Sequence, residues 1–243
     1  MSDHQLFGRA EEFTALDALV DGLAEAGGAL VVRGAPGIGK SALLARAARQ
    51  AERSGFTVLT ASGVEAESHL PFAGLHQLTR TMLDQVPGLP PVQAEALLGA
   101  FGMAQPSPTG RAPQLFMIAL ATLDLLGEAA GQAPVLLVVD DAHWLDSPTL
   151  DVLAFIARRL GPEPLGMLFG IRDGHTTCLD TLALRELRLH PSPRPMPGPS
   201  WMTWSRSWNR RSGTGCSTRP RATPWPSSNC LPRCVSREHR PRP

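Results

Sequence analysis

The sequence predicts an α/β fold, a three-layer sandwich with a parallel central sheet, and three observations lead to this prediction. A short apolar segment at 29–33 precedes a glycine-rich stretch, and a helix-forming segment at 41–55 follows that stretch. A second apolar segment at 56–60 comes next, and such a strand–helix–strand unit implies parallel strands. The third observation is a run of five aliphatic residues, Val135 to Val139, that is typical of a buried central strand and ends in two carboxylates.

Helices are expected before and between these strands. The first covers 12–26, where apolar residues recur at helical spacing, and Gly27-Gly28 is expected to end it. Three further segments with helical spacing separate the second strand from the third, and they are 71–84, 92–101 and 113–130.

A helix and a strand are expected after the run of aliphatic residues. Ser147 is predicted to cap a helix that has Pro148 in its first turn and runs to Leu160. A buried strand at 165–173 follows, with Arg172 at its end. We expect the whole domain to span residues 1–190.

The stretch GAPGIGKS, Gly34 to Ser41, matches the phosphate-binding pattern G-x-x-x-x-G-K-[ST], and it lies between a predicted strand and a predicted helix. Its glycines let the backbone curl so that N–H groups face phosphate oxygens. Lys40, the only lysine of the chain, is expected to reach the β- and γ-phosphates, and Ser41 to bind Mg²⁺. The residues predicted to bind ATP here are Gly34, Ala35, Pro36, Gly37, Ile38, Gly39, Lys40, Ser41 and Ala42.

Asp140 and Asp141 end the run of aliphatic residues. We expect their strand to lie beside the strand of the glycine-rich loop, so that Asp140 supports Mg²⁺ and Asp141 orients or deprotonates a water molecule. Arg172 is expected to face the γ-phosphate. Asp141, Lys40 and Arg172 are therefore the predicted catalytic residues, and an acid pair that merely ends a strand in solvent is the alternative.

Three neighbouring residues receive separate interpretations. Arg9, before the first helix, is a candidate for contact with the nucleotide base, whereas His143 and Trp144 are interpreted as structural residues of a packed turn. An ordinary small-molecule kinase is the alternative enzyme class, and phosphate transfer to an acceptor other than water would distinguish it.

The composition changes at about residue 190. Residues 1–190 contain 13 basic and 21 acidic residues, whereas 191–243 contain 10 arginines and one glutamate. The second segment also has 11 of the 23 prolines and four of the five tryptophans. We therefore expect 191–243 to be a separate, disordered and basic tail.

Five stretches of the chain resemble a known family, and they are FGRAEEFTALDALV, LVVRGAPGIGKSALLARAA, ESHLPFAGLHQL, PVLLVVDDAHWLDSPTLDVLAFIARRL and LGMLFGIRD. They look like the N-terminal ATPase domain of the large LuxR-type transcriptional regulators related to the maltose activator, in the STAND branch of AAA-like P-loop NTPases. The resemblance covers about residues 6–190. The stretches LPFAGLHQL and VDDAHWLD make it specific, because they go beyond the generic nucleotide motifs.

The resemblance implies an ATP-dependent switch, in which nucleotide and an inducer control self-association and, through a C-terminal helix-turn-helix domain, transcription. It places Gly34 to Ser41 in the Walker A motif, Asp140 and Asp141 in Walker B, and Arg172 at the sensor arginine. The family's downstream parts are not found in this sequence, so DNA binding is expected only through an absent module and turnover is expected to be slow or absent. Ala10 also departs from the family, which usually has an acidic residue after the Gly-Arg pair.

Residues 191–243 allow several interpretations. If GC-rich codons are assigned to CSTRPRATPWPSSNCLP and WMTWSRSW, a one-base shift of the reading frame can give a segment with Gly-Asn-Pro and a helical pattern. An out-of-frame translation is therefore predicted. Taken as written, ten arginines with interleaved tryptophans would instead suit a nucleic-acid-binding arm. A fragment without function is the third alternative. Cys230 and Cys234 have no neighbouring His or further Cys pair, so no metal site is predicted there.

The chain has no run of eighteen apolar residues, and its first residues carry charges where a signal peptide needs an apolar core. A cytoplasmic protein without a membrane partner is therefore expected.

Overall fold

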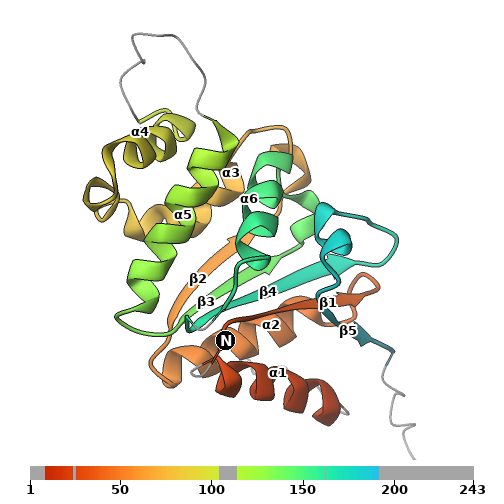
Figure 1. Cartoon of the computed structure of the whole chain (residues 1–243). Coiled ribbons are helices and arrows are strands. Elements are labelled where there is room, and N and C mark those ends of the chain that lie inside the picture. The colour runs from red at the N-terminus through yellow and green to blue at the C-terminus, as the bar shows by residue number, and fades with distance from the viewer. Residues whose placement is uncertain (1–8, 24–25, 104–113, 162, 192–243) are drawn as a thin grey trace, which may run out of the picture. The chain divides into compact units, whose positions relative to one another are not determined.

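Five parallel strands form one sheet in the order β2-β3-β4-β1-β5 within the part of the chain that the computed structural model describes, residues 9–23, 26–103, 114–161 and 163–191 (Figure 1). All of these residues belong to one unit of the chain, Met1–Arg194. The strands are β1 (Gly28–Gly34), β2 (Thr57–Ser62), β3 (Val135–Asp140), β4 (Leu165–Arg172) and β5 (Arg185–Leu189). The predicted α/β fold with a parallel central sheet is confirmed.

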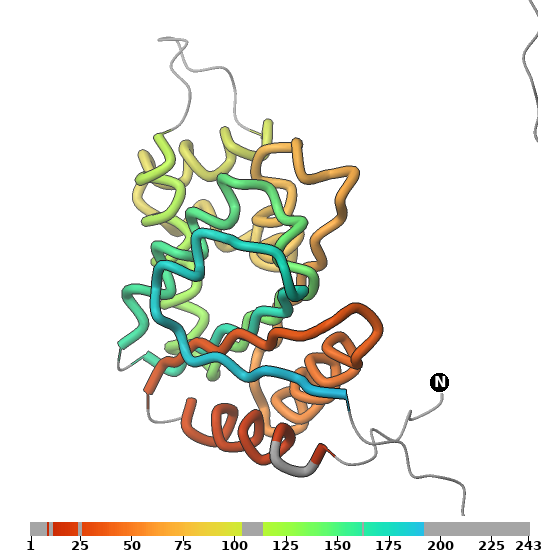
Figure 2. The backbone as a smooth tube through the Cα atoms, turned by 90° about the vertical axis from the view of Figure 1, so that its right-hand side faces the viewer, coloured from red at the N-terminus to blue at the C-terminus, as the bar shows by residue number. Residues whose placement is uncertain are grey.

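Helices cover both faces of the sheet, which gives the three expected layers. The helices are α1 (Ala10–Gly22), α2 (Lys40–Arg53), α3 (Ala73–Thr79), α4 (Pro91–Ala100), α5 (Leu115–Ala130) and α6 (Ser147–Ala157). Figures 1 and 2 show α1 and α2 on one face and α3, α5 and α6 on the other, and α4 packs against α5. Among the described residues, no helix has the length and apolar character needed to cross a membrane.

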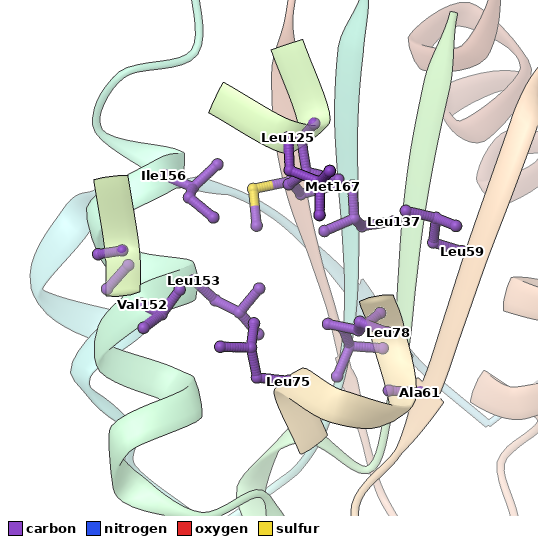
Figure 3. Close-up of a cluster of buried hydrophobic side chains, with 14 of the residues drawn as sticks. Leu59, Ala61, Leu75, Leu78, Leu125, Leu137, Val152, Leu153, Ile156 and Met167 are labelled. Atoms are coloured by element: carbon purple, nitrogen blue, oxygen red, sulfur yellow. The ribbon is translucent and has the colours of Figure 1, made fainter. Parts of the chain in front are cut away.

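The core consists of two clusters, one on each face, because side chains alternate along a strand. In β3, Leu136 and Val138 pack with α1 and α2, whereas Leu137 and Val139 pack with the helices of the other face. Figure 3 shows the second cluster, where Leu59, Leu137 and Met167 of the strands meet side chains of α3, α5 and α6. Each fully buried leucine of this kind contributes about 1.5–3 kcal/mol.

The element boundaries differ from prediction at three helices. The first helix ends at Gly22, before Gly27-Gly28, and α6 ends at Ala157. The predicted helix at 71–84 is the short α3 followed by a 3₁₀ turn, Arg80–Met82. Phe72 limits α3 at its start, because its φ of 61° lies in the left-handed region and cannot extend the helix.

The cap of α6 is Asp146, and the prediction of Ser147 was wrong. Asp146 has extended backbone angles and its carboxylate accepts a hydrogen bond from the Thr149 N–H, whereas Ser147 is already the first residue of the helix. Asp and Ser are both good N-cap residues, so the sequence alone does not show which of the two adjacent residues caps the helix. In the structure it is Asp146, because its carboxylate accepts the Thr149 N–H.

Strand β5 was missed because its sequence, RELRL, is mostly charged. It lies at the edge of the sheet, and four of its five residues are exposed or half-buried, so the only apolar alternation is the pair Leu187 and Leu189, which is too short to mark a strand. Its last residue, Leu189, is buried in the core with residues of α2, and Leu187 packs half-buried against the same cluster.

The strand order also corrects an expectation. Strand β3, which carries Asp140, was expected beside β1, but β4 lies between them and pairs with β1 from Gly28↔Gly166 to Gly34↔Arg172. Local sequence patterns predict that strands are parallel but not which strand is inserted between two others.

Candidate functional site

The glycine-rich loop between β1 and α2 depends on glycine in two different ways. Gly37 and Gly39 have φ angles of 71° and 104°, which residues with a side chain rarely adopt, and Gly39 caps α2. Gly34 has an ordinary backbone, but a Cβ there would lie 3.0 Å from Ile38 Cγ2 and 3.1 Å from Leu189 Cβ. The loop therefore curls at Gly37 and Gly39 and packs closely on β5 at Gly34.

Lys40, the first residue of α2, folds back onto this loop. Its side-chain ammonium donates hydrogen bonds to the Gly34 carbonyl at 2.9 Å and the Ala35 carbonyl at 3.1 Å, and the residue is only 7% exposed. Ser41 follows on the helix and is exposed. The loop thus has an ammonium held at its base, and the positive end of α2 adds to this charge.

Asp140, at the end of β3, reaches toward the loop across β4. A Cβ on Gly170 of β4 would lie 2.8 Å from Asp140 Oδ1 and 2.9 Å from Leu44 Cδ1 of α2. The carboxylate therefore occupies the space that a side chain at position 170 would fill. Asp140 and the loop share one edge of the sheet because the strands are parallel, and glycine at position 170 leaves space for the carboxylate over the strand between them.

Asp141 adopts a constrained turn directly after β3. Its φ is 45°, and its N–H donates to Asp140 Oδ1 at 2.9 Å. Gly63 packs so closely that a Cβ there would lie 2.2 Å from the Asp141 carbonyl oxygen. The backbone of this acid pair is thus fixed from two sides.

Arg172 ends β4 opposite Gly34 of β1, and its side chain is exposed. The next residue ties the two strands together, because the Asp173 N–H donates to the Gly34 carbonyl at 3.1 Å. The predicted residue therefore lies beside the first glycine of the loop.

Arg9 is buried against the loop, with 5% of its surface exposed. One terminal nitrogen of its guanidinium donates to the Ile38 carbonyl, and the other is buried and has no hydrogen-bond partner among the described residues. Arg9 thus contacts the loop backbone.

The residues at this edge fit Mg²⁺ bound together with a phosphate. Ser41 and Asp140 offer a hydroxyl and a carboxylate oxygen, the donor types that this cation takes. In the described part of the chain, no group of three His, Cys, Asp or Glu side chains is arranged to hold a metal ion. An ion here would need phosphate and water ligands in addition, as is common for Mg²⁺, and when bound it would neutralise phosphate charge.

The role of Asp146 in joining two helices was not predicted from the sequence. Its carboxylate is 3% exposed and accepts hydrogen bonds from the N–H groups of Phe72 at 2.8 Å and Gly74 at 3.1 Å, as well as from Thr149. The Thr149 hydroxyl in turn accepts from the Leu75 N–H at 3.0 Å. Asp146 and Thr149 therefore hold the beginnings of α3 and α6 together.

His143 and Trp144 lie in a 3₁₀ turn, η4 (Ala142–Trp144), between the acid pair and Asp146. Their rings meet His175, which follows β4, with centroid distances of 4.3 Å for His143 and 5.3 Å for Trp144. Trp144 also lines a pocket of about 330 Å³ with residues of α3 and of the segment before it. The structural interpretation describes Trp144 well, whereas His143 has both ring nitrogens buried and unpaired among the described residues.

Cys178 begins the 3₁₀ turn η5 (Cys178–Leu182) and is half-buried. Burial, with the nearby charge of Asp151, raises the pKa of its thiol, so it stays protonated and unreactive at neutral pH. Cys230 and Cys234 lie outside the described residues.

The model of the AAA ATPase domain family matches residues 5–169, which is more than half of the chain. A search among curated proteins finds no significant match. Solved structures with a similar fold include Cdc6p from Pyrobaculum aerophilum, with a TM-score of 0.50 and 15% identity over 77% of this chain and 46% of that one.

Two others are the ORC2 protein of Aeropyrum pernix in ADPNP and ADP complexes, and AMPPCP-bound DnaA from Aquifex aeolicus. Their TM-scores are 0.45 and 0.40, their identities 18% and 15%, and each matches 76% of this chain and 48% or 47% of its own. The chain thus spans about half the length of these proteins, and at such identities the likeness concerns the fold alone. The match of the family model over more than half of the sequence shows that the chain belongs to the AAA ATPase domain family.

Proposed function

We propose that this chain is an ATP-binding switch domain that hydrolyses ATP slowly and belongs to a LuxR-type transcriptional regulator. Membership of the AAA ATPase domain family supports nucleotide binding. The observation that carries the proposal is the joint position of Lys40, Asp140 and Arg172 at one edge of the sheet, with Gly170 leaving room for the Asp140 carboxylate.

In this proposal the loop binds the phosphates. Backbone N–H groups of Gly37, Gly39 and Lys40 face the oxygens, and the Lys40 ammonium exchanges its two carbonyl partners for phosphate oxygens. A phosphate oxygen carries more negative charge than a carbonyl oxygen, so this exchange favours the bound state. Ser41 and Asp140 would hold Mg²⁺, and Arg9 would fix the loop backbone at Ile38.

Asp141 and Arg172 would act on the terminal phosphate. The constrained turn gives the Asp141 carboxylate a fixed position from which to orient or deprotonate a water molecule. Arg172 would stabilise the charge that develops on the phosphate, because it ends the strand beside the loop. Arg172 is exposed, so it has freedom to move toward the phosphate.

The link to LuxR-type regulators is supported by the contact between two stretches, LPFAGLHQL and VDDAHWLD. Asp146 of the second stretch binds the N–H groups of Phe72 and Gly74 in the first. This contact would connect the nucleotide site to α3 and offers a path for the nucleotide state to reach a neighbouring surface. Self-association, DNA binding through a module outside this sequence, and a cytoplasmic location are parts of the same proposal.

Lys40→Ala tests the nucleotide site. Loss of a charge-assisted contact to phosphate should weaken the binding of a fluorescent ATP analogue about 100-fold in the presence of Mg²⁺. Arg49→Ala removes an exposed cation from the same helix and is the matched control, with affinity unchanged. Equal affinity of Lys40→Ala and the original protein would refute the site, and transfer of phosphate to an acceptor other than water would indicate a kinase instead.

The regulator and the boundary at residue 190 are tested on the coding DNA. An adjacent reading frame that continues past codon 190 into a Gly-x-Pro segment and a helix-turn-helix domain is the expected result. If none of the frames continues in this way, the proposal of a LuxR-type regulator fails, and nucleic-acid binding by 191–243 is the next property to measure.

A further inference from the structure

His143 presents two buried polar atoms without partners. Both ring nitrogens are inaccessible to solvent, and neither has a hydrogen-bond partner among the residues that the structure describes. Leaving a polar group buried and unpaired costs about 1–3 kcal/mol, so such groups are rare in folded proteins. A turn that only needed packing would be more stable with an apolar residue at this position.

His143 lies at the edge of the sheet that carries the candidate site, in a turn that packs against β4. The turn η4 follows β3, and the His175 ring, 4.3 Å away between centroids, belongs to the turn after β4. The strand β4 separates β3 from the strand of the loop, so the turns that carry the two rings follow neighbouring strands. The charges of Lys40, Asp141 and Arg172 act on His143, as expected for a residue at this edge of the sheet.

His175 is itself held in place by Arg33, which precedes the glycine-rich loop. The Arg33 side chain is 9% exposed, donates to the His175 carbonyl at 2.8 Å and forms an ion pair with Asp180. The Trp144 ring closes the cluster, with its centroid 5.1 Å from that of His143. The His143 ring therefore packs against the rings of Trp144 and His175, which also contact each other.

The imidazole is neutral at neutral pH. Burial lowers the pKa of His143, and the proximity of His175, Lys40 and Arg172 lowers it further, while Asp141 opposes them. A neutral imidazole has one N–H donor and one acceptor nitrogen. It can therefore donate one hydrogen bond to a phosphate oxygen.

We propose that His143 donates a hydrogen bond to the terminal phosphate of a bound nucleoside triphosphate, and that this contact lets the site distinguish the triphosphate from the diphosphate. The inference rests on the proposed nucleotide site and adds a substrate-contacting residue to it. His143 makes no contact with a diphosphate held by the same loop, because the group that it binds is then missing. His175 is a positioning residue that packs against the His143 ring, and Arg33 supports it by donating to the His175 carbonyl.

The test compares affinities for a non-hydrolysable ATP analogue and for ADP, measured with Mg²⁺ by calorimetry. His143→Ala should weaken analogue binding about 10-fold or more and leave ADP binding within about 2-fold, as expected for a hydrogen bond to a charged group. His143→Gln retains an N–H donor and should recover part of the difference. His69→Ala, which removes an exposed histidine, is the matched control.

Two results would overturn the inference. Unchanged affinity of His143→Ala for the analogue would show that there is no contact, and an equal loss for analogue and ADP would show a purely structural role. If the unmodified protein binds neither ligand, the nucleotide site itself fails, which is a different outcome.

A second measurement uses the unmodified protein and does not depend on how the variants fold. Imidazole nitrogen resonances of ¹⁵N-histidine-labelled protein should include one that differs between the analogue-bound and ADP-bound forms. Identical imidazole spectra in the two forms would contradict the inference.

Discussion

The buried carboxylate of Asp146 binds N–H groups at the beginnings of two helices. It caps α6 through Thr149 and at the same time accepts the N–H groups of Phe72 and Gly74 at the start of α3. Both helices begin with N–H groups that have no partner within the helix. One side chain thus satisfies donors from two helices whose sequences are more than seventy residues apart.

Asp146→Ala should lower the free energy of unfolding by about 3 kcal/mol, because it leaves several buried N–H groups without an acceptor. Ser147→Ala is the matched control and should change stability by less than about 0.5 kcal/mol, since this exposed residue does not cap the helix. Urea unfolding followed by circular dichroism measures both. A larger loss in Ser147→Ala than in Asp146→Ala would contradict the assignment of the cap.

Residue roles were predictable only where spacing along the chain defines them. The loop from Gly34 to Ser41 and its preceding strand and following helix follow from a local pattern, and the structure contains them. The bond from Asp146 to α3 and the placement of His143 beside His175 depend on how distant segments pack. His143 is interpreted from the sequence as a structural residue because it fits a packed turn after a strand, and its immediate sequence does not show whether its ring nitrogens have partners.

Strand β4 is the element that joins the two halves of the candidate site. It separates β3 from β1, and glycine at two of its positions relieves close contacts on the same face. At Gly170 a side chain would meet Asp140, and at Gly166 it would meet Leu23 of the segment after α1, 2.3 Å from its Cδ1. Strand β4 therefore has one glycine beside the candidate site, Gly170, and one in the core, Gly166.

Gly170→Ala should displace the Asp140 carboxylate and reduce the Mg²⁺-dependent affinity for ATP about 10-fold, with some loss of stability as well. Gly166→Ala should cost about 1–3 kcal/mol of stability through overpacking, with nucleotide affinity unchanged. Binding titrations with and without Mg²⁺, together with thermal unfolding, separate the two effects. Equal Mg²⁺ dependence in Gly170→Ala and the original protein would exclude a role for Asp140 in metal binding.

At the scale of elements, the sequence predicted type better than arrangement. The apolar cores of β1 to β4 and the helices around them follow from hydrophobic periodicity. The edge strand β5 and the insertion of β4 between β1 and β3 do not, because β5 is short and mostly charged and strand order is a property of the whole sheet. The edge of the sheet that carries the candidate site was nevertheless predicted, since the carboxyl ends of parallel strands meet there in any order.

The two described core clusters use residues from one continuous part of the sequence. All buried residues of the two described clusters lie between Leu16 and Leu189. The predicted disordered tail at 191–243 lies outside the described residues, apart from Pro191 itself. The domain boundary at residue 190 therefore stays a prediction.

Truncation after Pro191 tests that boundary. The shortened chain should unfold at the same temperature as the full chain and bind the ATP analogue with the same affinity, because the residues of both clusters and of the candidate site are retained. Differential scanning calorimetry and a binding titration provide the comparison. A clearly lower unfolding temperature would mean that residues beyond 191 stabilise the domain.

The single lysine of the chain makes it possible to observe the glycine-rich loop by NMR. Of 23 lysines and arginines, Lys40 alone is a lysine, and its ammonium bridges two carbonyls of the loop. Protein grown with isotope-labelled lysine therefore contains one labelled side chain, located at the proposed phosphate site. Its ammonium resonance would follow the occupancy of the loop directly, without a mutation or an attached dye.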